Sequence, residues 1–280
     1  MARLPDGRGL AFRCSGSGSP TVILEGGWAA NSLGWGRVQP LVAPVTRVCS
    51  YDRAGSGRSD PGPAPRDGAA IARDLDDGLR AAKIAGPFVV VGHSAGGLYV
   101  RLFADRRPAD VAGMVLVDPS VEYQDKRLSA VYGPGAGSLA PLRVRTAACL
   151  AAAKAHALPS PDPKLAKCDA ATPVATWAAE VEELDTLWGA TSDEVAAGRS
   201  SYGALPLIVL TAGDTNAALP DPARRAADRV WAGLHLELAE HSSIGVRRTV
   251  AGTGHLIPKD RPDAVAAAII EVIRAGRGAG

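Results

Sequence analysis

The amino-acid sequence predicts an α/β fold, in which a mostly parallel central sheet is flanked by helices. Short segments rich in β-branched residues alternate with segments whose apolar residues recur at helical spacing. Two of the apolar segments, Phe88–Val91 and Val111–Val117, have the character of strands that are buried on both faces. A helical segment separates them, and this order implies a right-handed crossover between parallel strands.

The N-terminal half of the chain supplies most of the predicted sheet. A turn of glycine and serine residues separates the first two strands, and a glycine-rich segment ends the third. Ile71, Leu75 and Leu79 recur at helical spacing and predict a helix before the first buried strand. The predicted elements are, in order, strands Leu10–Cys14, Thr21–Leu24 and Thr46–Tyr51, helix Ile71–Ala85, strand Phe88–Val91, helix Gly97–Asp105 and strand Val111–Val117.

The sequence pattern changes between about Ser120 and Leu205. Prolines and glycines cluster there, Ala-rich helical pieces lie between them, and no strand pattern occurs. We predict that residues 120–205 form a helical cap, which is inserted into a core made of residues 1–119 and 206–280. The core resumes with strand Leu207–Leu210, helix Pro222–Leu238, strand Val246–Val250 and helix Pro262–Arg274.

Composition and charge argue against several classes of function. The 280 residues are 46% hydrophobic and 21% charged, and the formal net charge is only +2. Lysine and arginine are not concentrated in one segment, so we expect no nucleic-acid partner. No stretch reaches the roughly 18 apolar residues of a membrane helix, and the N-terminus has no hydrophobic signal region. We therefore expect a cytoplasmic protein without a membrane partner, with export of a longer precursor as the alternative.

The four cysteines, Cys14, Cys49, Cys149 and Cys168, include no C-x-x-C pair. We therefore expect no zinc site and no other metal site. Two disulfides and four buried free thiols are both consistent with this spacing. We expect no cofactor.

The segment Gly92-His93-Ser94-Ala95-Gly96 has the G-x-S-x-G pattern of a nucleophile elbow. A serine hydroxyl is a poor nucleophile unless a base removes its proton and the backbone fixes its position. Here Ser94 lies between an apolar strand and a segment that is compatible with a helix. The N-terminus of that helix would point backbone N–H groups at the site and favour developing negative charge. Ser94 is therefore the candidate nucleophile.

Three motifs together resemble the α/β-hydrolase superfamily over nearly the whole chain. They are Pro20–Gly26 (PTVILEG), Tyr51–Asp60 (YDRAGSGRSD) and Val91–Ala104 (VGHSAGGLYVRLFA), in that order. They resemble an esterase-like branch with a VGHSxGG elbow and a YDRAGxGxSD motif. The resemblance implies an α/β-hydrolase fold with a catalytic triad of Ser, His and Asp and with an oxyanion hole.

The resemblance places the oxyanion hole on two backbone N–H groups. The first is the N–H of Ala95, directly after the nucleophile. The second comes from the loop after the strand Thr21–Leu24, where alignment with the strand-His-Gly-x pattern of the family indicates Trp28. Trp35 lies where the family commonly has a tryptophan, which supports the alignment. This chain departs from the family pattern because Glu25-Gly26-Gly27 replaces the common His-Gly.

His255 is the candidate general base among the five histidines. It lies in a Gly-rich loop after the predicted strand Val246–Val250, and this loop leaves the imidazole exposed. A histidine on the loop after the last strand, following the serine in chain order, matches the arrangement in the superfamily. His93 is held by the elbow, and we expect it only to pack against the elbow or to support it.

Two aspartates are candidates for the acid of the triad, which would orient the imidazole and stabilise its protonated form. Asp118 follows the strand Val111–Val117 and lies 24 residues after Ser94, a spacing that haloalkane dehalogenases of this superfamily share. Asp214 follows the strand Leu207–Leu210, near the position that is commoner in the superfamily. We favour Asp118 and keep Asp214 as the alternative.

The predicted function is hydrolysis of a carboxylic ester, lactone or thioester of a small, largely apolar substrate through an acyl-enzyme intermediate. A serine at the elbow separates this chain from the haloalkane dehalogenases and epoxide hydrolases of the fold, which use aspartate. An acyltransferase or natural-product tailoring enzyme with the same triad is one alternative, and a non-catalytic binding protein of this fold is another.

Two further expectations concern the cap and the cysteines. In the predicted cap, Trp177, Leu184 and Trp188 recur at near-helical spacing and are candidates for the substrate pocket. The resemblance also implies that the strands carrying Cys14 and Cys49 are neighbours in the sheet, so that the two cysteines would approach each other.

Overall fold

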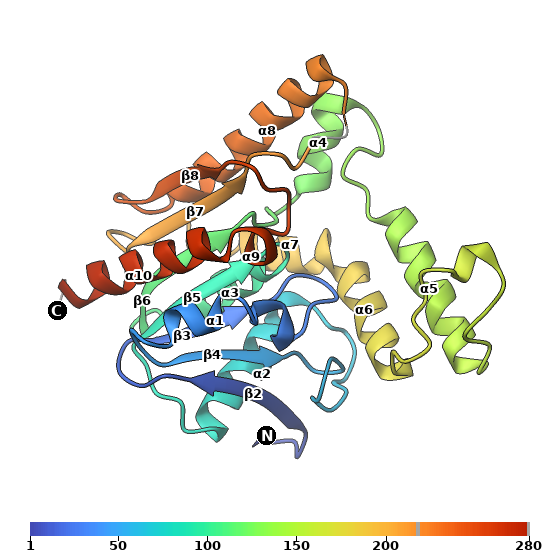
Figure 1. Cartoon of the computed structure of the whole chain (residues 1–280), viewed down its shortest axis with the longest axis horizontal. Coiled ribbons are helices and arrows are strands. Elements are labelled where there is room, and N and C mark those ends of the chain that lie inside the picture. The colour runs from blue at the N-terminus through green and yellow to red at the C-terminus, as the bar shows by residue number, and fades with distance from the viewer. Residues whose placement is uncertain (217–218, 279–280) are drawn as a thin grey trace.

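Eight strands in the part of the chain that the structure describes form one central sheet (Figure 1). The computed structural model describes residues 1–216 and 219–278. In sheet order the strands are β1 (Ala2–Arg3), β2 (Gly9–Ser15), β4 (Val48–Asp52), β3 (Thr21–Glu25), β5 (Phe88–His93), β6 (Val111–Val117), β7 (Leu207–Ala212) and β8 (Val246–Val250). β2 pairs antiparallel with β1 and β4, and the pairs from β4 to β8 are parallel. The predicted α/β fold with a mostly parallel sheet is confirmed.

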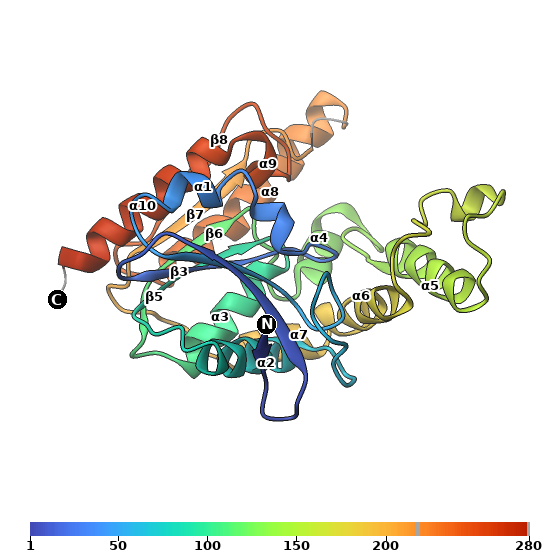
Figure 2. The same cartoon turned by 60° about the horizontal axis from the view of Figure 1, so that its bottom comes forward.

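Helices cover both faces of the sheet, because successive residues of each strand point to opposite faces and both sets are apolar. In β5, Val90 belongs to one core, and Val89 and Val91 belong to the other. One face carries α2 (Gly68–Ala81), α3 (Gly96–Arg106) and α8 (Asp221–Glu240), and the opposite face carries α1 (Gln39–Val42) and α10 (Pro262–Gly278) (Figures 1 and 2). None of the helices in the described residues combines the length and the apolar character that crossing a membrane requires.

The predicted elements of the core are present, with ends that differ by a few residues. The helix predicted over Ile71–Ala85 begins at Gly68, because the carboxylate of Asp67 accepts the N–H of Ala70 and caps the helix. It ends at Ala81, shortly before Lys83 adopts a left-handed conformation with φ of +53°. β1, α1 and the short α9 (Ile257–Asp260) were not predicted, because they have at most four residues each and are too short to show a period.

Helices make up the regular structure between β6 and β7. Residues 118–206, all of which the structure describes, contain no strand. Their α-helices are α4 (Gln124–Tyr132), α5 (Ala140–Lys154), α6 (Val174–Leu187) and α7 (Ala190–Ala196). α5 and α6 pack against each other and extend away from the sheet (Figures 1 and 2). α7 packs against α2 and α3 instead, so the last part of this segment joins the helices that cover the sheet.

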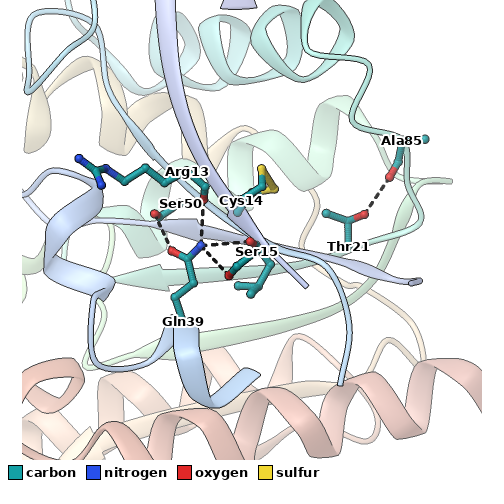
Figure 3. Close-up of a disulfide and its surroundings, with 9 residues drawn as sticks. Arg13, Cys14, Ser15, Thr21, Gln39, Ser50 and Ala85 are labelled. Atoms are coloured by element: carbon teal, nitrogen blue, oxygen red, sulfur yellow. Dashed lines mark hydrogen bonds between the residues drawn. A yellow bond between two sulfur atoms is a disulfide. The ribbon is translucent and has the colours of Figure 1, made fainter. Parts of the chain in front are cut away.

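Two disulfides join all four cysteines. Cys14 of β2 and Cys49 of β4 lie directly opposite each other in the antiparallel pair, so the expected approach of these two cysteines is confirmed (Figure 3). The side-chain amide of Gln39 links the same two strands. It donates to the carbonyl of Arg13 in β2 and accepts from the hydroxyl of Ser50 in β4 (Figure 3). The second disulfide, Cys149–Cys168, ties α5 to the segment before α6.

Candidate active site

Ser94 lies at the sharp turn between β5 and α3, in a left-handed conformation with φ of +54°. Such a conformation is unfavourable for a serine and persists only where the surrounding structure enforces it. Two close approaches require glycine. A Cβ atom on Gly92 would overlap the carbonyl oxygen of Gly96, and a Cβ atom on Gly96 would lie 2.6 Å from the carbonyl oxygen of Gly26. These glycines let the strand turn directly into the helix and expose Ser94 at the turn.

The imidazole of His255 lies between Ser94 and Asp118. Its Nε2 is 2.9 Å from Oγ of Ser94, and its Nδ1 is 2.7 Å from Oδ2 of Asp118. His255 comes from the loop between β8 and α9, and 41% of its side chain is exposed. When Nδ1–H donates to the carboxylate, Nε2 has a lone pair that can accept the hydroxyl proton of Ser94. The three side chains therefore have the geometry of a nucleophile, a base and an orienting acid.

Asp118 follows β6, and its side chain is completely buried. Besides His255, it binds two donors through Oδ1, which accepts the backbone N–H of Ala212 at 3.0 Å and the indole N–H of Trp231 at 2.8 Å. Burial raises the pKa of this carboxyl, but the hydrogen bond and charge of His255 outweigh burial and hold the pKa below its ordinary value. Asp118 is therefore ionised at neutral pH and can stabilise a protonated imidazole.

Asp214, the alternative acid, is an exposed residue of the loop after β7. Its backbone N–H donates to the carbonyl of Thr253 at 3.0 Å, which links this loop to the one that carries His255. Among the hydrogen bonds of the described residues, none joins its carboxylate to His255, whose Nδ1 is bound to Asp118. The geometry thus favours Asp118 over Asp214 as the partner of the imidazole.

The two residues predicted to form the oxyanion hole come from the elbow (Ala95) and from the loop after β3 (Trp28). Ala95 follows Ser94 and is completely buried at the start of α3. Trp28 follows Gly27, which lies so close to the elbow that a Cβ atom on Gly27 would be 2.9 Å from Cβ of Ser94. Within residues 1–216 and 219–278, neither N–H donates to a backbone acceptor. Two unpaired donors beside a nucleophile are what an oxyanion hole requires.

His93 supports the loop of the candidate base. Its Nε2 lies 2.8 Å from the carbonyl oxygen of His255, and the centroids of the two rings are 4.8 Å apart. A carbonyl only accepts hydrogen bonds, so Nε2 of His93 carries the proton. Burial, together with the neighbouring His255, lowers the pKa of His93 to about 4, and the ring is neutral at pH 7. His93 therefore holds the backbone of His255 without adding a charge to the site.

Two residues of α8, which were not predicted as site residues, hold the surroundings of Asp118. Trp231 donates to the carboxylate itself, as described above. His235 is completely buried, with Nε2 3.0 Å from the carbonyl oxygen of Pro119 and Nδ1 2.8 Å from Oγ1 of Thr211. Burial lowers the pKa of His235 to about 4, so it too is neutral. The only signal in the sequence is that the two aromatic rings are four residues apart, on one face of a helix, which is equally typical of a core.

Ser94 and His255 form part of the wall of a cavity of about 940 Å³. The remaining wall is mostly apolar and includes leucine and tryptophan side chains from α4, α5, α6 and α8 and from the ends of these helices, among them Leu128, Leu142, Leu184, Leu187, Trp188 and Trp231. Leu184 and Trp188 thus lie where the sequence predicted pocket residues.

The prediction that Trp177 lines the pocket is wrong. Its side chain is outside the cavity wall and packs against Cys149 and Cys168. Trp177 is seven residues before Leu184 on α6, which is about 10 Å along a helix axis. Helical spacing places both residues on one face, but the turn at Leu184 contacts the cavity and the turn at Trp177 contacts the disulfide.

Glu180, on the part of α6 whose backbone binds the indole N–H of Trp28, has a pKa above its ordinary value. Burial, and then the charge of Glu183, raise the pKa of Glu180 to about 7, against the opposing effect of Arg53. The native state therefore favours the neutral acid. Ionisation costs native stability as the pH rises through 7, whereas below about pH 4.5 the group is protonated in both the folded and the unfolded chain.

We expect Glu180→Gln to stabilise the protein by about 1 kcal/mol at pH 8, after allowance for the solvent screening of this half-buried group, and to change nothing at pH 4.5. Urea unfolding at the two pH values measures the difference. Glu240→Gln removes the same charge from an exposed position of α8 and serves as the control. Equal gains at both pH values would contradict the prediction.

Comparison with known proteins gives a family match over most of the chain and relatives that match shorter stretches of it. The family model described as "Alpha/beta hydrolase family" matches residues 22–268. The uncharacterized protein YqjL of Bacillus subtilis is 34% identical over 119 residues, which cover 40% of this chain and 46% of YqjL. Lipase LipV of Mycobacterium tuberculosis is 34% identical over 119 residues, which cover 41% of this chain and 43% of LipV. The chain therefore matches less than half of the length of these relatives.

Solved structures of other proteins share the fold. The epoxide hydrolase CorEH has a TM-score of 0.70 at 17% identity, and the match covers 98% of this chain and 97% of CorEH. A thermophilic esterase from Thermogutta terrifontis has a TM-score of 0.65 at 21% identity, with 98% and 97% of the two chains covered. At this level of identity the likeness establishes the arrangement of strands and helices. The chemistry has to be inferred from the residues of the site.

Proposed function

This chain belongs to the α/β hydrolase family, and from this premise we propose that it hydrolyses a carboxylic ester with Ser94 as nucleophile, His255 as general base and Asp118 as the orienting acid. One observation carries the proposal. The Oγ of Ser94 is 2.9 Å from Nε2 of His255, and Nδ1 of His255 is 2.7 Å from the buried carboxylate of Asp118. This continuous chain of hydrogen bonds is how a serine hydroxyl becomes a nucleophile at neutral pH.

In the first half of the reaction, Oγ of Ser94 attacks the carbonyl carbon of the ester while its proton passes to Nε2 of His255. The ionised carboxylate of Asp118 stabilises the imidazolium that forms. The carbonyl oxygen becomes negative and accepts hydrogen bonds from the N–H groups of Ala95 and Trp28. When the ester C–O bond breaks, His255 returns the proton to the leaving alcohol, and the acyl group stays on Ser94.

The second half repeats these steps with water. His255 takes a proton from a water molecule, which attacks the acyl carbon and forms a second oxyanion in the same place. The acid then leaves, and Oγ of Ser94 recovers its proton from His255. The exposed part of the His255 side chain is consistent with the access of water that this step needs.

The cavity supports an apolar substrate of considerable size. Its volume of about 940 Å³ is near the upper end of the roughly 300–1,000 Å³ of ligand pockets, and its wall is mostly apolar. This favours a bulkier acyl or alcohol group than the small substrate that the sequence suggested. Esters are also the substrates of the thermophilic esterase that shares the fold, as its name states.

The disulfides bear on the compartment in which the protein works. Disulfides persist in oxidising surroundings and are rare where cellular thiols are kept reduced. Because both cysteine pairs are bonded, we propose that the protein works in an oxidising compartment, which agrees with the alternative of export and differs from the cytoplasmic location expected from the sequence.

A fluorophosphonate probe and a panel of p-nitrophenyl esters, from acetate to palmitate, test the proposed function. We expect the probe to label Ser94, identified by mass spectrometry of the labelled peptide, and kcat/KM to increase from acetate to medium acyl chains. Heat-denatured protein is the control, since labelling must depend on the folded site. A native protein that neither binds the probe at Ser94 nor hydrolyses any ester of the panel would refute the proposal.

A further inference from the structure

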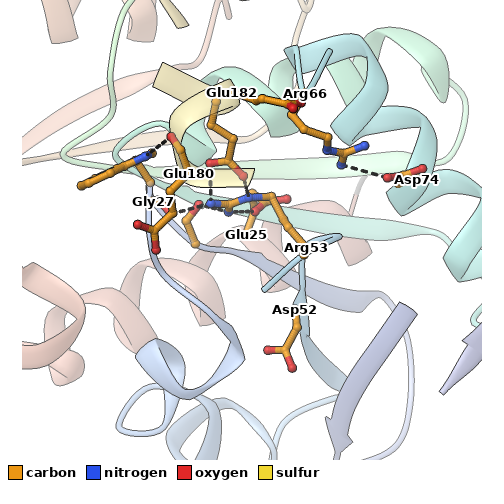
Figure 4. A network of polar contacts seen from close by, with 12 residues as sticks. Glu25, Gly27, Asp52, Arg53, Arg66, Asp74, Glu180 and Glu182 are labelled. Atoms are coloured by element: carbon orange, nitrogen blue, oxygen red, sulfur yellow. Dashed lines mark hydrogen bonds and ion pairs between the residues drawn. The ribbon is translucent and has the colours of Figure 1, made fainter. Parts of the chain in front are cut away.

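Arg53 follows β4 and is almost completely buried, with 3% of its side chain exposed. A guanidinium group has five N–H donors, and here all five have an acceptor. Figure 4 shows Arg53 beside Glu25 and next to the part of α6 that carries Glu180 and Glu182. The contacts are from Nη1 to the carbonyl oxygen of Gly26 (2.8 Å) and Oε1 of Glu25 (2.7 Å), from Nη2 to the carbonyl oxygen of Gly27 (2.8 Å) and Oε2 of Glu183 (3.0 Å), and from Nε to Oε1 of Glu183 (2.9 Å).

The two carbonyl groups that Arg53 binds belong to the loop that supplies Trp28. The carbonyl of Gly27 and the N–H of Trp28 are the two ends of one planar trans peptide group, and they point in opposite directions. A donor that fixes this carbonyl therefore also fixes the direction of the Trp28 N–H. The loop depends on such a restraint, because Gly26 and Gly27 lack a Cβ atom and have access to many backbone conformations.

The same arginine connects this loop to α6. Glu183 of α6 accepts two of the five N–H groups, in the bidentate geometry that fixes both position and orientation. A second link runs in parallel, since the indole N–H of Trp28 donates to the carbonyl of Glu180 at 2.9 Å. Both the backbone and the side chain of the loop are thus attached to one helix of the segment between β6 and β7.

Ion pairing alone does not account for this arrangement. One guanidinium faces two buried carboxylates, those of Glu25 and Glu183. Burial raises the pKa of Glu25 even though Arg53 and the Tyr51 hydroxyl bind it. Buried charges of this kind cost desolvation energy and seldom stabilise a fold more than apolar residues would. What they provide here is a fixed direction for the two loop carbonyls.

The geometry points to Arg53 as a positioning residue, which holds the loop Gly26–Trp28 in its anion-binding orientation and couples that orientation to α6 through Glu183. This inference rests on the proposed ester hydrolysis. The Trp28 N–H acts mainly on the transition state, in which the oxygen is negative, so a loop that loses its restraint lowers kcat and leaves KM nearly unchanged.

The test compares Arg53→Lys with Arg66→Lys in steady-state hydrolysis of a p-nitrophenyl ester. Lysine keeps the charge but has three donors and no planar fork, so it cannot hold both carbonyls and both carboxylates. We expect kcat to fall about 10- to 100-fold in Arg53→Lys, with KM within about threefold of the wild type. Arg66 is a buried arginine paired with Asp74 in the same region (Figure 4), and Arg66→Lys should change kcat less than threefold.

Glu183→Gln tests the coupling to α6 and also covers the case in which Arg53→Lys does not fold. It keeps the shape of the side chain and one acceptor, and we expect a three- to tenfold loss in kcat. The double variant should lose less than the product of the two single losses, because both act on one loop. Circular dichroism shows which variants are folded.

Two outcomes overturn the inference while the proposed function stands. One is a folded Arg53→Lys or Glu183→Gln variant with the kcat of an active wild type, and the other is a loss that appears in KM with kcat unchanged. A wild type that is inactive and unlabelled by the fluorophosphonate probe refutes the proposed function itself. The two failures are therefore distinguishable.

Discussion

Ser94→Ala is expected to lower kcat for ester hydrolysis by about 10⁶-fold and to leave KM within a few-fold of the wild-type value. The variant removes the only atom that bonds to the acyl carbon in the proposed mechanism. It retains the cavity, the unpaired N–H groups and the imidazole, so substrate binding should persist. A small residual rate over water is expected from the remaining donors.

The measurement needs a protein that is otherwise unaltered. Alanine has the same Cβ atom as serine, so the left-handed backbone at position 94 should be tolerated as it is now. Ser120→Ala removes a second serine hydroxyl from the wall of the same cavity and is the matched control, with a kcat close to that of the wild type. If Ser94→Ala kept more than about one percent of the wild-type kcat, another group would have to be the nucleophile.

The approach of Ser94 and His255 could be predicted, because local sequence indicates the elbow and a parallel sheet brings the loops of both residues to one edge. An apolar strand that ends in a glycine and passes into a helix fixes the elbow, and parallel strands bring their following loops to one edge of the sheet. The loop after β6 and the loop after β8 lie at that edge, which brings Asp118 and His255 within reach of Ser94. The sequence pattern predicted the elbow, and the resemblance to the superfamily indicated the loop of the base and the two candidates for the acid.

The supporting contacts could not be predicted, because they join residues that are far apart in the sequence. Trp231 binds a carboxylate 113 positions away, and Arg53 binds Glu183 across 130 positions. Neither residue type nor spacing indicates such a partner before the helices are packed. Arg53 stands in a motif that the resemblance had already singled out, but the motif gives no sign that its guanidinium binds the loop beside the nucleophile.

Trp177 illustrates a second limit of the sequence. A helical period tells which residues share a face, but it does not tell what each turn of that face contacts. The face of α6 passes from the disulfide at Trp177 to the cavity at Leu184. The disulfide itself depends on a pairing of Cys149 with Cys168 that the spacing left open.

Asp118→Asn is expected to lower kcat by about 10⁴-fold, whereas Asp214→Asn should change it by no more than a few-fold. The hydrogen bonds around Asp118 explain the size of this effect. Its Oδ1 accepts two N–H groups, from Ala212 and Trp231, so the carbonyl oxygen of an asparagine would take this place. The amide NH₂ would then face His255 and donate to Nδ1.

An imidazole that accepts at Nδ1 carries its proton on Nε2, and that proton points at the hydroxyl of Ser94. In this tautomer His255 cannot take the hydroxyl proton, so the nucleophile is not activated even though every atom stays in place. Steady-state kinetics of both variants, with circular dichroism for folding, measure the difference. Full activity in Asp118→Asn together with a large loss in Asp214→Asn would reverse the assignment. Asp118 has a pKa below its ordinary value. In the wild type, protonation of Asp118 should therefore lower the rate only at a pH well below neutrality.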